Sequence, residues 1–148
     1  MNILTIMGSL AKSIFSIIIG FLAGSLSCFI YIIAGTYFFR NIFINNNYDS
    51  YSELVTIFAT NPLILAYMFI FSVVANFTSG YLTAKIANRL FIFHSIVVGL
   101  IFNAVLVLNS PILVQKHFFV AVALFFTGLC ASFLGGKIFN DRQQRQTV

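Results

Sequence analysis

The chain has 148 residues, of which 60% are hydrophobic and 7% are charged, and its mean hydropathy is +1.01. Soluble domains carry about 25% charged residues, and they need polar groups over most of their exterior. This composition excludes a water-soluble globular domain. Because the apolar runs are continuous rather than alternating, they predict an all-α integral membrane protein and not a β-barrel.

Four segments reach the roughly 20 mostly apolar residues that a spanning helix needs. They predict a single-domain four-transmembrane-helix bundle with spans at about 13–39, 62–86, 90–108 and 112–139, followed by a cytoplasmic tail at 140–148. The first run is uncharged and is longer than the core of a signal peptide. We therefore expect it to be a retained span.

Two Pro-containing pairs mark helix starts, because Asn or Ser caps a helix and Pro fits its first position. Asn61-Pro62 begins the second span in this way, and Ser110-Pro111 begins the fourth. The connection 85–89 is very short, so we expect spans two and three to be antiparallel neighbours.

The segment between the first two spans carries its own helix signal. Ser50 and Glu53 have the spacing of a capping box, and an apolar stretch follows them. This pattern predicts a short interfacial helix over about 51–59. Asn45 to Asn47 precede it as a polar turn.

Positive charges are unevenly shared between the two sides of the predicted bundle. The side that holds both termini and the 85–89 connection carries Lys12, Lys85, Arg89, Lys137, Arg142 and Arg145, whereas the other side carries Arg40 and Lys116. The positive-inside rule then places both termini in the cytoplasm of a cell with an inner membrane. The same charges predict contact with anionic lipid at the cytoplasmic face, and not with nucleic acid.

Every predicted span has small residues at four-residue spacing, which lets helix backbones approach closely in lipid. This pattern favours a tightly packed bundle over isolated helices. The candidate helix-packing residues are Gly20, Gly24, Gly80, Gly99, Gly128, Ser132 and Gly136.

Polar residues inside the spans are the candidates for a functional site. If the turn between spans two and three centres between residues 89 and 90, Asn76 and Asn103 share one depth near the bilayer centre. They are either a hydrogen-bonded pair that joins two helices or the lining of a solute path. The same register sets Gly80 level with Gly99, as a close backbone crossing.

The same register sets a further pair, Lys85 and His94, at one depth near the cytoplasmic end. These two residues are either a pH-sensitive or anion-binding pair or side chains that reach out to the membrane interface.

Two fragments of the sequence recur. Residues 16–22 resemble 95–101, and residues 81–88 resemble 133–140 as aromatic-Leu-small-small-Lys-Ile-x-Asn. The recurrence is either a repeat of two parallel hairpins, related by a pseudo-two-fold axis along the membrane normal, or chance similarity between apolar segments.

Side chains typical of catalytic, metal-binding or ion-coupled sites are missing from the sequence pattern. No Asp or Glu falls inside a span, where a proton-coupled carrier would need one, and there is no nucleophile–base pair, metal-ligand cluster or phosphate loop. Cys28 and Cys130 form no Cys-x-x-Cys motif. We therefore expect no catalytic residues, no metal, no cofactor and no enzymatic activity.

The stretch Ser79-Gly80-Tyr81-Leu82-Thr83-Ala84, followed by His94-Ser95-Ile96-Val97-Val98-Gly99-Leu100, resembles a pattern of uncharacterised small four-span bacterial membrane proteins. Their pattern has Gly-Gly-Tyr-x-Ala-x-x-Ala and then His-Gly-x-x-x-Gly-Leu, of which this chain keeps Gly-Tyr-x-x-Ala and His-x-x-x-x-Gly-Leu. Ser79 replaces the first Gly and Ser95 the Gly after His, and the family often ends in a Gly-Gly pair like Gly135-Gly136. The resemblance covers about a third of the chain. It implies a bacterial four-span protein and carries over no active residue.

These observations leave two functions. The first is a non-enzymatic scaffold, accessory or regulatory subunit that works as a homo-oligomer or with a partner membrane protein. The alternative is an oligomeric channel or carrier for a neutral or anionic small solute, lined by Asn76, Asn103, His94 and Lys85.

Overall fold

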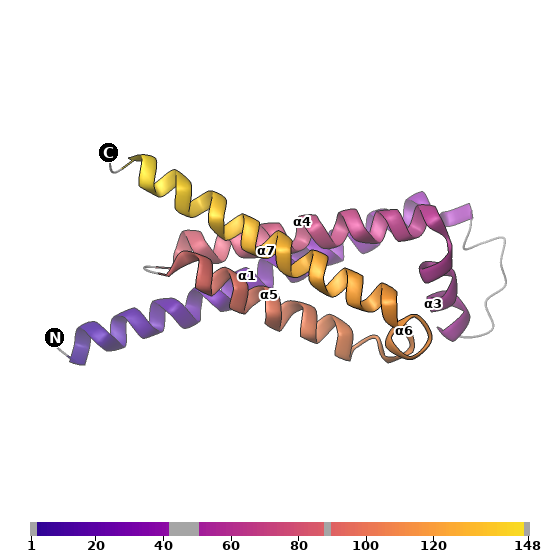
Figure 1. The fold of residues 1–148 in the computed structure, drawn as a ribbon, viewed down its shortest axis with the longest axis horizontal. Helices are drawn as coiled ribbons and strands as arrows, with labels where there is room; N and C mark the ends of the chain where they lie inside the picture. Colours follow the sequence, from indigo (N-terminus) through magenta and orange to yellow (C-terminus); the bar gives the residue numbers. More distant parts are fainter. Residues whose placement is uncertain (1–2, 42–50, 88–89, 147–148) are drawn as a thin grey trace.

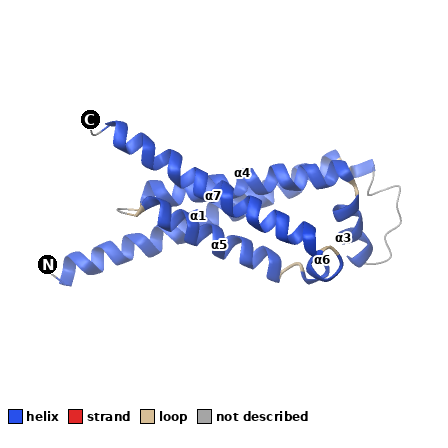
Figure 2. Cartoon of the chain, in the orientation of Figure 1, coloured by secondary structure: helices blue, strands red, loops and turns tan. Residues whose placement is uncertain are grey.

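The computed structural model describes residues 3–41, 51–87 and 90–146, and they fold into helices with no strand among them (Figure 2). The helices are α1 (Ile3–Phe38), α3 (Tyr51–Thr60), α4 (Pro62–Ile86), α5 (Phe91–Leu108), α6 (Pro111–Lys116) and α7 (Phe118–Gln146). α1, α4, α5 and α7 are long and apolar enough to cross a membrane. The predicted four-span architecture and the short helix between the first two spans are confirmed.

The helices form an elongated bundle with two different ends (Figure 1). Both chain termini and the α4–α5 connection lie at one end, which we call the terminal end, and α3 and α6 lie at the other, the α3–α6 end. α4 is the central helix, because it packs against α7, α1 and α5, and α5 also packs against α7. α3 contacts α4 and α6 and so covers its end of the bundle.

The cap predicted at the start of α4 is present. The Asn61 side chain accepts hydrogen bonds from the backbone N–H groups of Leu63 and Ile64, at 3.1 and 3.3 Å. The cap predicted at Ser110 is not present, because its side chain makes no capping hydrogen bond. The capping box of α3 involves Ser50, which lies outside the described residues.

The fourth span differs from the prediction of one helix over 112–139. Pro111–Lys116 forms the separate helix α6, and the chain leaves helical geometry at His117, with φ −134° and ψ 50°. α7 begins at Phe118. The break falls beside Lys116, at the boundary of the apolar run, where lost helix hydrogen bonds can be satisfied by water rather than in hydrocarbon.

Two helix boundaries also lie beyond the predicted limits. α7 continues to Gln146, through the segment expected to be a tail, because its Gln and Arg residues are good helix formers. α1 begins at Ile3, before the span expected at 13–39, and passes Lys12 without a break. The apolar part of α1 that could cross a membrane is Leu10–Phe38.

Small and polar residues fill the interior, and large apolar residues cover the outside. Buried positions include Ala75, Ala84, Ala131, Ser95 and Ser132, whereas most of the Phe, Leu and Ile side chains are exposed. This inverted pattern is expected in lipid, where large apolar side chains lose nothing by staying outside and small ones let helices approach.

The packing bears on the predicted internal repeat in two ways. Gly80 and Ser132 directly precede the matched fragments 81–88 and 133–140, so they would be counterparts in the repeat. They meet where α4 crosses α7, as a pseudo-two-fold axis between these helices requires. However, α5 packs against both α4 and α7, whereas α1 packs against α4 and α5 and not comparably against α7 in the described residues. The repeat therefore stays a hypothesis.

Candidate functional site

Small and polar residues of α4, α5 and α7 meet at one place, which we call the small-residue junction. The four-residue spacing read from the sequence sets them on one face of each helix. The junction consists of Asn76 and Gly80 of α4, Ser95, Gly99 and Asn103 of α5, and Gly128, Ser132 and Gly136 of α7.

Two serines link the three helices of the junction. The Ser132 hydroxyl donates to the backbone carbonyl of Ser95 at 2.6 Å, and the Ser95 hydroxyl donates to the carbonyl of Gly80 at 2.8 Å. Both serines are fully buried. The chain of bonds runs from α7 through α5 to α4, so it fixes the relative depth of all three helices.

The predicted Asn76–Asn103 hydrogen bond is present. The Asn103 amide donates to Oδ1 of Asn76 at 2.8 Å, and the return contact from the Asn76 amide is longer, at 3.5 Å. Each amide also donates to a carbonyl of its own helix, that of Ser72 for Asn76 and that of Gly99 for Asn103. Every amide nitrogen of the pair is therefore satisfied without water.

Glycines of α7 make room for these contacts. A Cβ at Gly128 would overlap the Asn76 and Asn103 amides, and one at Gly136 would overlap the Ser95 side chain. The close packing predicted for these two glycines and for Ser132 is therefore present. Because the overlapped atoms belong to buried, hydrogen-bonded groups, a larger residue has little room to be accommodated.

Gly80 and Gly99, which are predicted to cross closely, both lie against Ser132 of α7. A Cβ at either glycine would overlap Ser132, at its backbone for Gly80 and at its side chain for Gly99. A turn connecting two helices sets their depth but not their rotation, so the sequence did not reveal this shared contact with a third helix.

The small residues of α1 pack against a second face of α4. A Cβ at Gly20 would overlap the Thr83 hydroxyl, and one at Gly24 would press on Ser79 and Phe102. Thr83 donates to the carbonyl of Ser79, but the hydroxyl of Ser79 has no hydrogen-bond partner among the described residues.

His94 and Lys85, which the register predicts at one depth, differ in their exposure. His94 is only 7% exposed, and its Nδ1 lies 2.9 Å from the carbonyl of Leu90 in its own helix, so it does not reach out to the interface. Lys85 is exposed, and no hydrogen bond or ion pair joins it to His94 within the described part of the chain. The histidine is therefore held by α5 itself, separately from the asparagine pair.

Basic residues gather at the terminal end, on different helices. Those that the structure describes are Lys12, Lys85, Lys137, Arg142 and Arg145, all exposed. Arg142 of α7 also reaches α4, where it donates to the Tyr81 hydroxyl at 3.4 Å. Arg89 lies outside the described residues.

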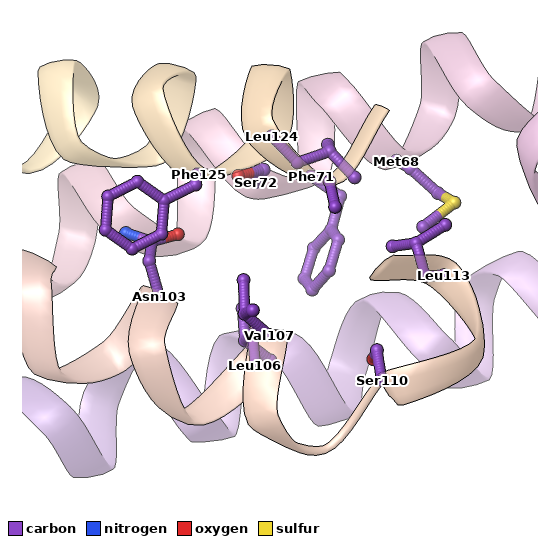
Figure 3. A pocket seen from close by; sticks show the side chains of 11 residues that line it. Met68, Phe71, Ser72, Asn103, Leu106, Val107, Ser110, Leu113, Leu124 and Phe125 are labelled. Atoms are coloured by element: carbon purple, nitrogen blue, oxygen red, sulfur yellow. The ribbon is translucent and has the colours of Figure 1, made fainter. Parts of the chain in front are cut away.

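A cavity of about 130 Å³ begins beside the asparagine pair, and we call it the four-helix cavity. Figure 3 shows Asn103 at one end of it and Ser110 and Leu113 at the other. Its walls come from α4, α5, α6 and α7, and they include Met68, Phe71, Ser72, Leu106, Val107, Ala121, Leu124 and Phe125.

A second cavity, of about 230 Å³, lies between α1, α3 and α4, and we call it the aromatic cavity. Met68 and Phe71 line both cavities and so separate them. Tyr67 crosses toward α1, where its hydroxyl donates to the carbonyl of Tyr31 at 2.6 Å. A Cβ at Gly35 would press on the Tyr67 ring, so this glycine makes room for the tyrosine.

The sequence patterns missed some of these residues. Gly135 packs directly on the backbone of α4 at Phe77 and Tyr81, although only its neighbour Gly136 fitted the four-residue spacing. The contact of Ser79 and Thr83 with α1 was also missed, and four-residue spacing could have found it. The sequence patterns did not predict the cavities, because each cavity depends on how large side chains from several helices pack together.

Within the described residues, no three His, Cys, Asp or Glu side chains lie together as a metal site would require. Comparison with models of protein families, with curated proteins and with solved structures finds no match to this chain.

Proposed function

We propose that the chain is a non-enzymatic scaffold, accessory or regulatory subunit of a bacterial inner membrane, acting as a homo-oligomer or with a partner membrane protein. The carrying observation is that α1 is much less buried than the other three candidate spans. One side of α1 packs on α4 and α5. The opposite side keeps seven large apolar residues about one helical turn apart, each at least 49% exposed: Leu10, Ile14, Ile18, Leu22, Leu26, Phe29 and Ile33.

The interior supports the non-enzymatic part of the proposal. The polar groups of the small-residue junction bind one another in two sets, the serines across α7, α5 and α4 and the asparagines across α4 and α5. Such bonds between spans stabilise a bundle by about 0.6–2 kcal/mol each. Polar groups that are already hydrogen-bonded to one another hold the helices together, and their donor atoms are not free to bind a substrate.

Cysteine cross-linking tests the scaffold proposal. In a chain with Cys28 and Cys130 replaced by Ala, Leu22→Cys should give disulfide-linked dimers or a cross-link to a copurifying membrane protein. Ile70→Cys on α4 is the matched control, because Ile70 and Leu22 are about equally exposed, at 62% and 60%. Equal cross-linking at both positions would contradict a specific interface on α1.

The proposed orientation places the terminal end in the cytoplasm, supported by the basic residues gathered there. Reporter fusions after Val148 and at Asn46 should report opposite sides of the membrane. The same basic residues support contact with anionic lipid, which predicts stronger retention of phosphatidylglycerol than of phosphatidylcholine on the purified protein.

The alternative, an oligomeric channel or carrier, is favoured by one observation: Asn103 both joins the buried pair and lines the four-helix cavity. Flux of neutral and anionic solutes into proteoliposomes separates the two functions. A scaffold gives no flux above that of empty liposomes, whereas a carrier gives flux that Asn103→Leu alters without unfolding the protein.

A further inference from the structure

The four-helix cavity has the size of a small organic molecule. Its volume is about 130 Å³, and an apolar cavity of roughly 150 Å³ stays dry and takes up benzene. The walls formed by Leu106, Val107 and Leu124 are apolar. A single aromatic ring or a short hydrocarbon chain therefore fits this space.

One wall of the cavity carries an unpartnered hydroxyl. Ser72 is 7% exposed and lines the cavity, yet its hydroxyl makes no hydrogen bond within the described part of the chain. By contrast, the Thr78 hydroxyl of the same helix donates to the carbonyl of Val74. The Ser72 hydroxyl is therefore free to hydrogen-bond to a ligand that enters the cavity.

The end of the cavity carries an acceptor with spare capacity. The Oδ1 atom of Asn103 receives only the 3.5 Å contact from the Asn76 amide, whose shorter bond, at 2.9 Å, goes to the Ser72 carbonyl. An amide oxygen can accept two hydrogen bonds. The side chains of Ser72 and Asn103 therefore offer a donor and an acceptor to one small hydroxyl group.

We propose that the four-helix cavity binds a small alcohol or phenol. The ligand places its apolar body between Val107 and Leu124 and its hydroxyl toward Ser72 and Asn103, donating to the Asn103 Oδ1 and accepting from the Ser72 hydroxyl. A convergent polar pair in an otherwise apolar pocket is the usual design of a small-molecule site. This site is independent of the scaffold proposal.

Ligand-observed fluorine NMR on the full chain in lipid nanodiscs tests the site with two probes, 4-fluorophenol and fluorobenzene. The phenol should bind saturably, and fluorobenzene should bind about tenfold more weakly, because it leaves Ser72 and Asn103 unpaired. Ser72→Ala should weaken phenol binding severalfold and leave fluorobenzene unchanged. Equal affinity of the two probes for the unmodified protein would overturn the proposed ligand class.

Filling the cavity locates the binding. Ala121→Leu should abolish saturable binding of 4-fluorophenol, and Val107→Phe serves the same purpose if the first variant does not fold. Leu134→Phe is the control, because Leu134 is 49% exposed on α7 and does not line the cavity. Binding that survives both filled variants, or signal changes that never saturate, would overturn the site.

Discussion

The small-residue junction and the α3–α6 end share α4, α5 and α7 but use different side chains of these helices. In the junction, glycines and Ser132 of α7 lie directly against α4 and α5, and glycines such as Gly80 have no room for a Cβ. Toward the α3–α6 end, Met68, Phe71 and Tyr67 separate the helices, and two cavities remain.

The difference shows how helices pack in a bilayer. Lipid chains are as apolar as the side chains they would replace, so no hydrophobic force closes gaps between large residues. Close contact arises where small residues let backbones approach and short polar side chains bond across helices. We therefore expect the junction to carry most of the bundle's stability. The α3–α6 end should tolerate changes in side-chain volume.

Gly80→Leu should break the junction and have the largest effect. A side chain there must displace the backbone of Ser132, so overpacking should lower the free energy of unfolding by about 3 kcal/mol. Unfolding in detergent by SDS titration measures the loss. Ala66→Leu, at an exposed position of the same helix, should be close to neutral, and similar losses for both variants would contradict the contrast.

Gly128→Ala should have the next largest effect. The added methyl group would lie against both asparagine amides and would force the pair apart, with a loss of about 1–3 kcal/mol. The same SDS titration applies. If Gly128→Ala loses much less stability in an Asn76→Ala/Asn103→Ala background, the damage acts through the amide pair; an unchanged loss would show that it does not.

Replacement of either asparagine should have a smaller effect than the glycine variants. Asn76→Leu or Asn103→Leu should lower the free energy of unfolding by about 1 kcal/mol or less, because the remaining amide keeps the carbonyl bond within its own helix. The double variant should lose less than the sum of the two, since both single variants remove one shared contact. Additive losses would exclude this coupling.

Tyr67→Phe probes the α3–α6 end and should have the smallest effect. It removes the hydrogen bond to the Tyr31 carbonyl and keeps the ring against Gly35, so the loss should be about 0.6 kcal/mol. A loss larger than that of Asn103→Leu, measured under the same conditions, would contradict the expectation that the small-residue junction carries most of the bundle's stability.

Much of this architecture could be read from the residues alone. Hydropathy located four spans, because backbone polar groups in lipid must be satisfied within a helix. The Asn61 cap and the short α4–α5 connection set the antiparallel pair, and helix rise then gave Asn76 and Asn103 a common depth. These features depend on local geometry, which the sequence determines by itself.

The features that the sequence did not determine are those that depend on helix rotation and on a third helix. Ser132 of α7 lies against both Gly80 and Gly99, and the Ser95 hydroxyl donates to the carbonyl of Gly80. The break at His117 and the two cavities likewise reflect how separate helices fit together. In lipid, large apolar faces are nearly interchangeable, so the tertiary contacts of small residues decided which face of each helix turned inward.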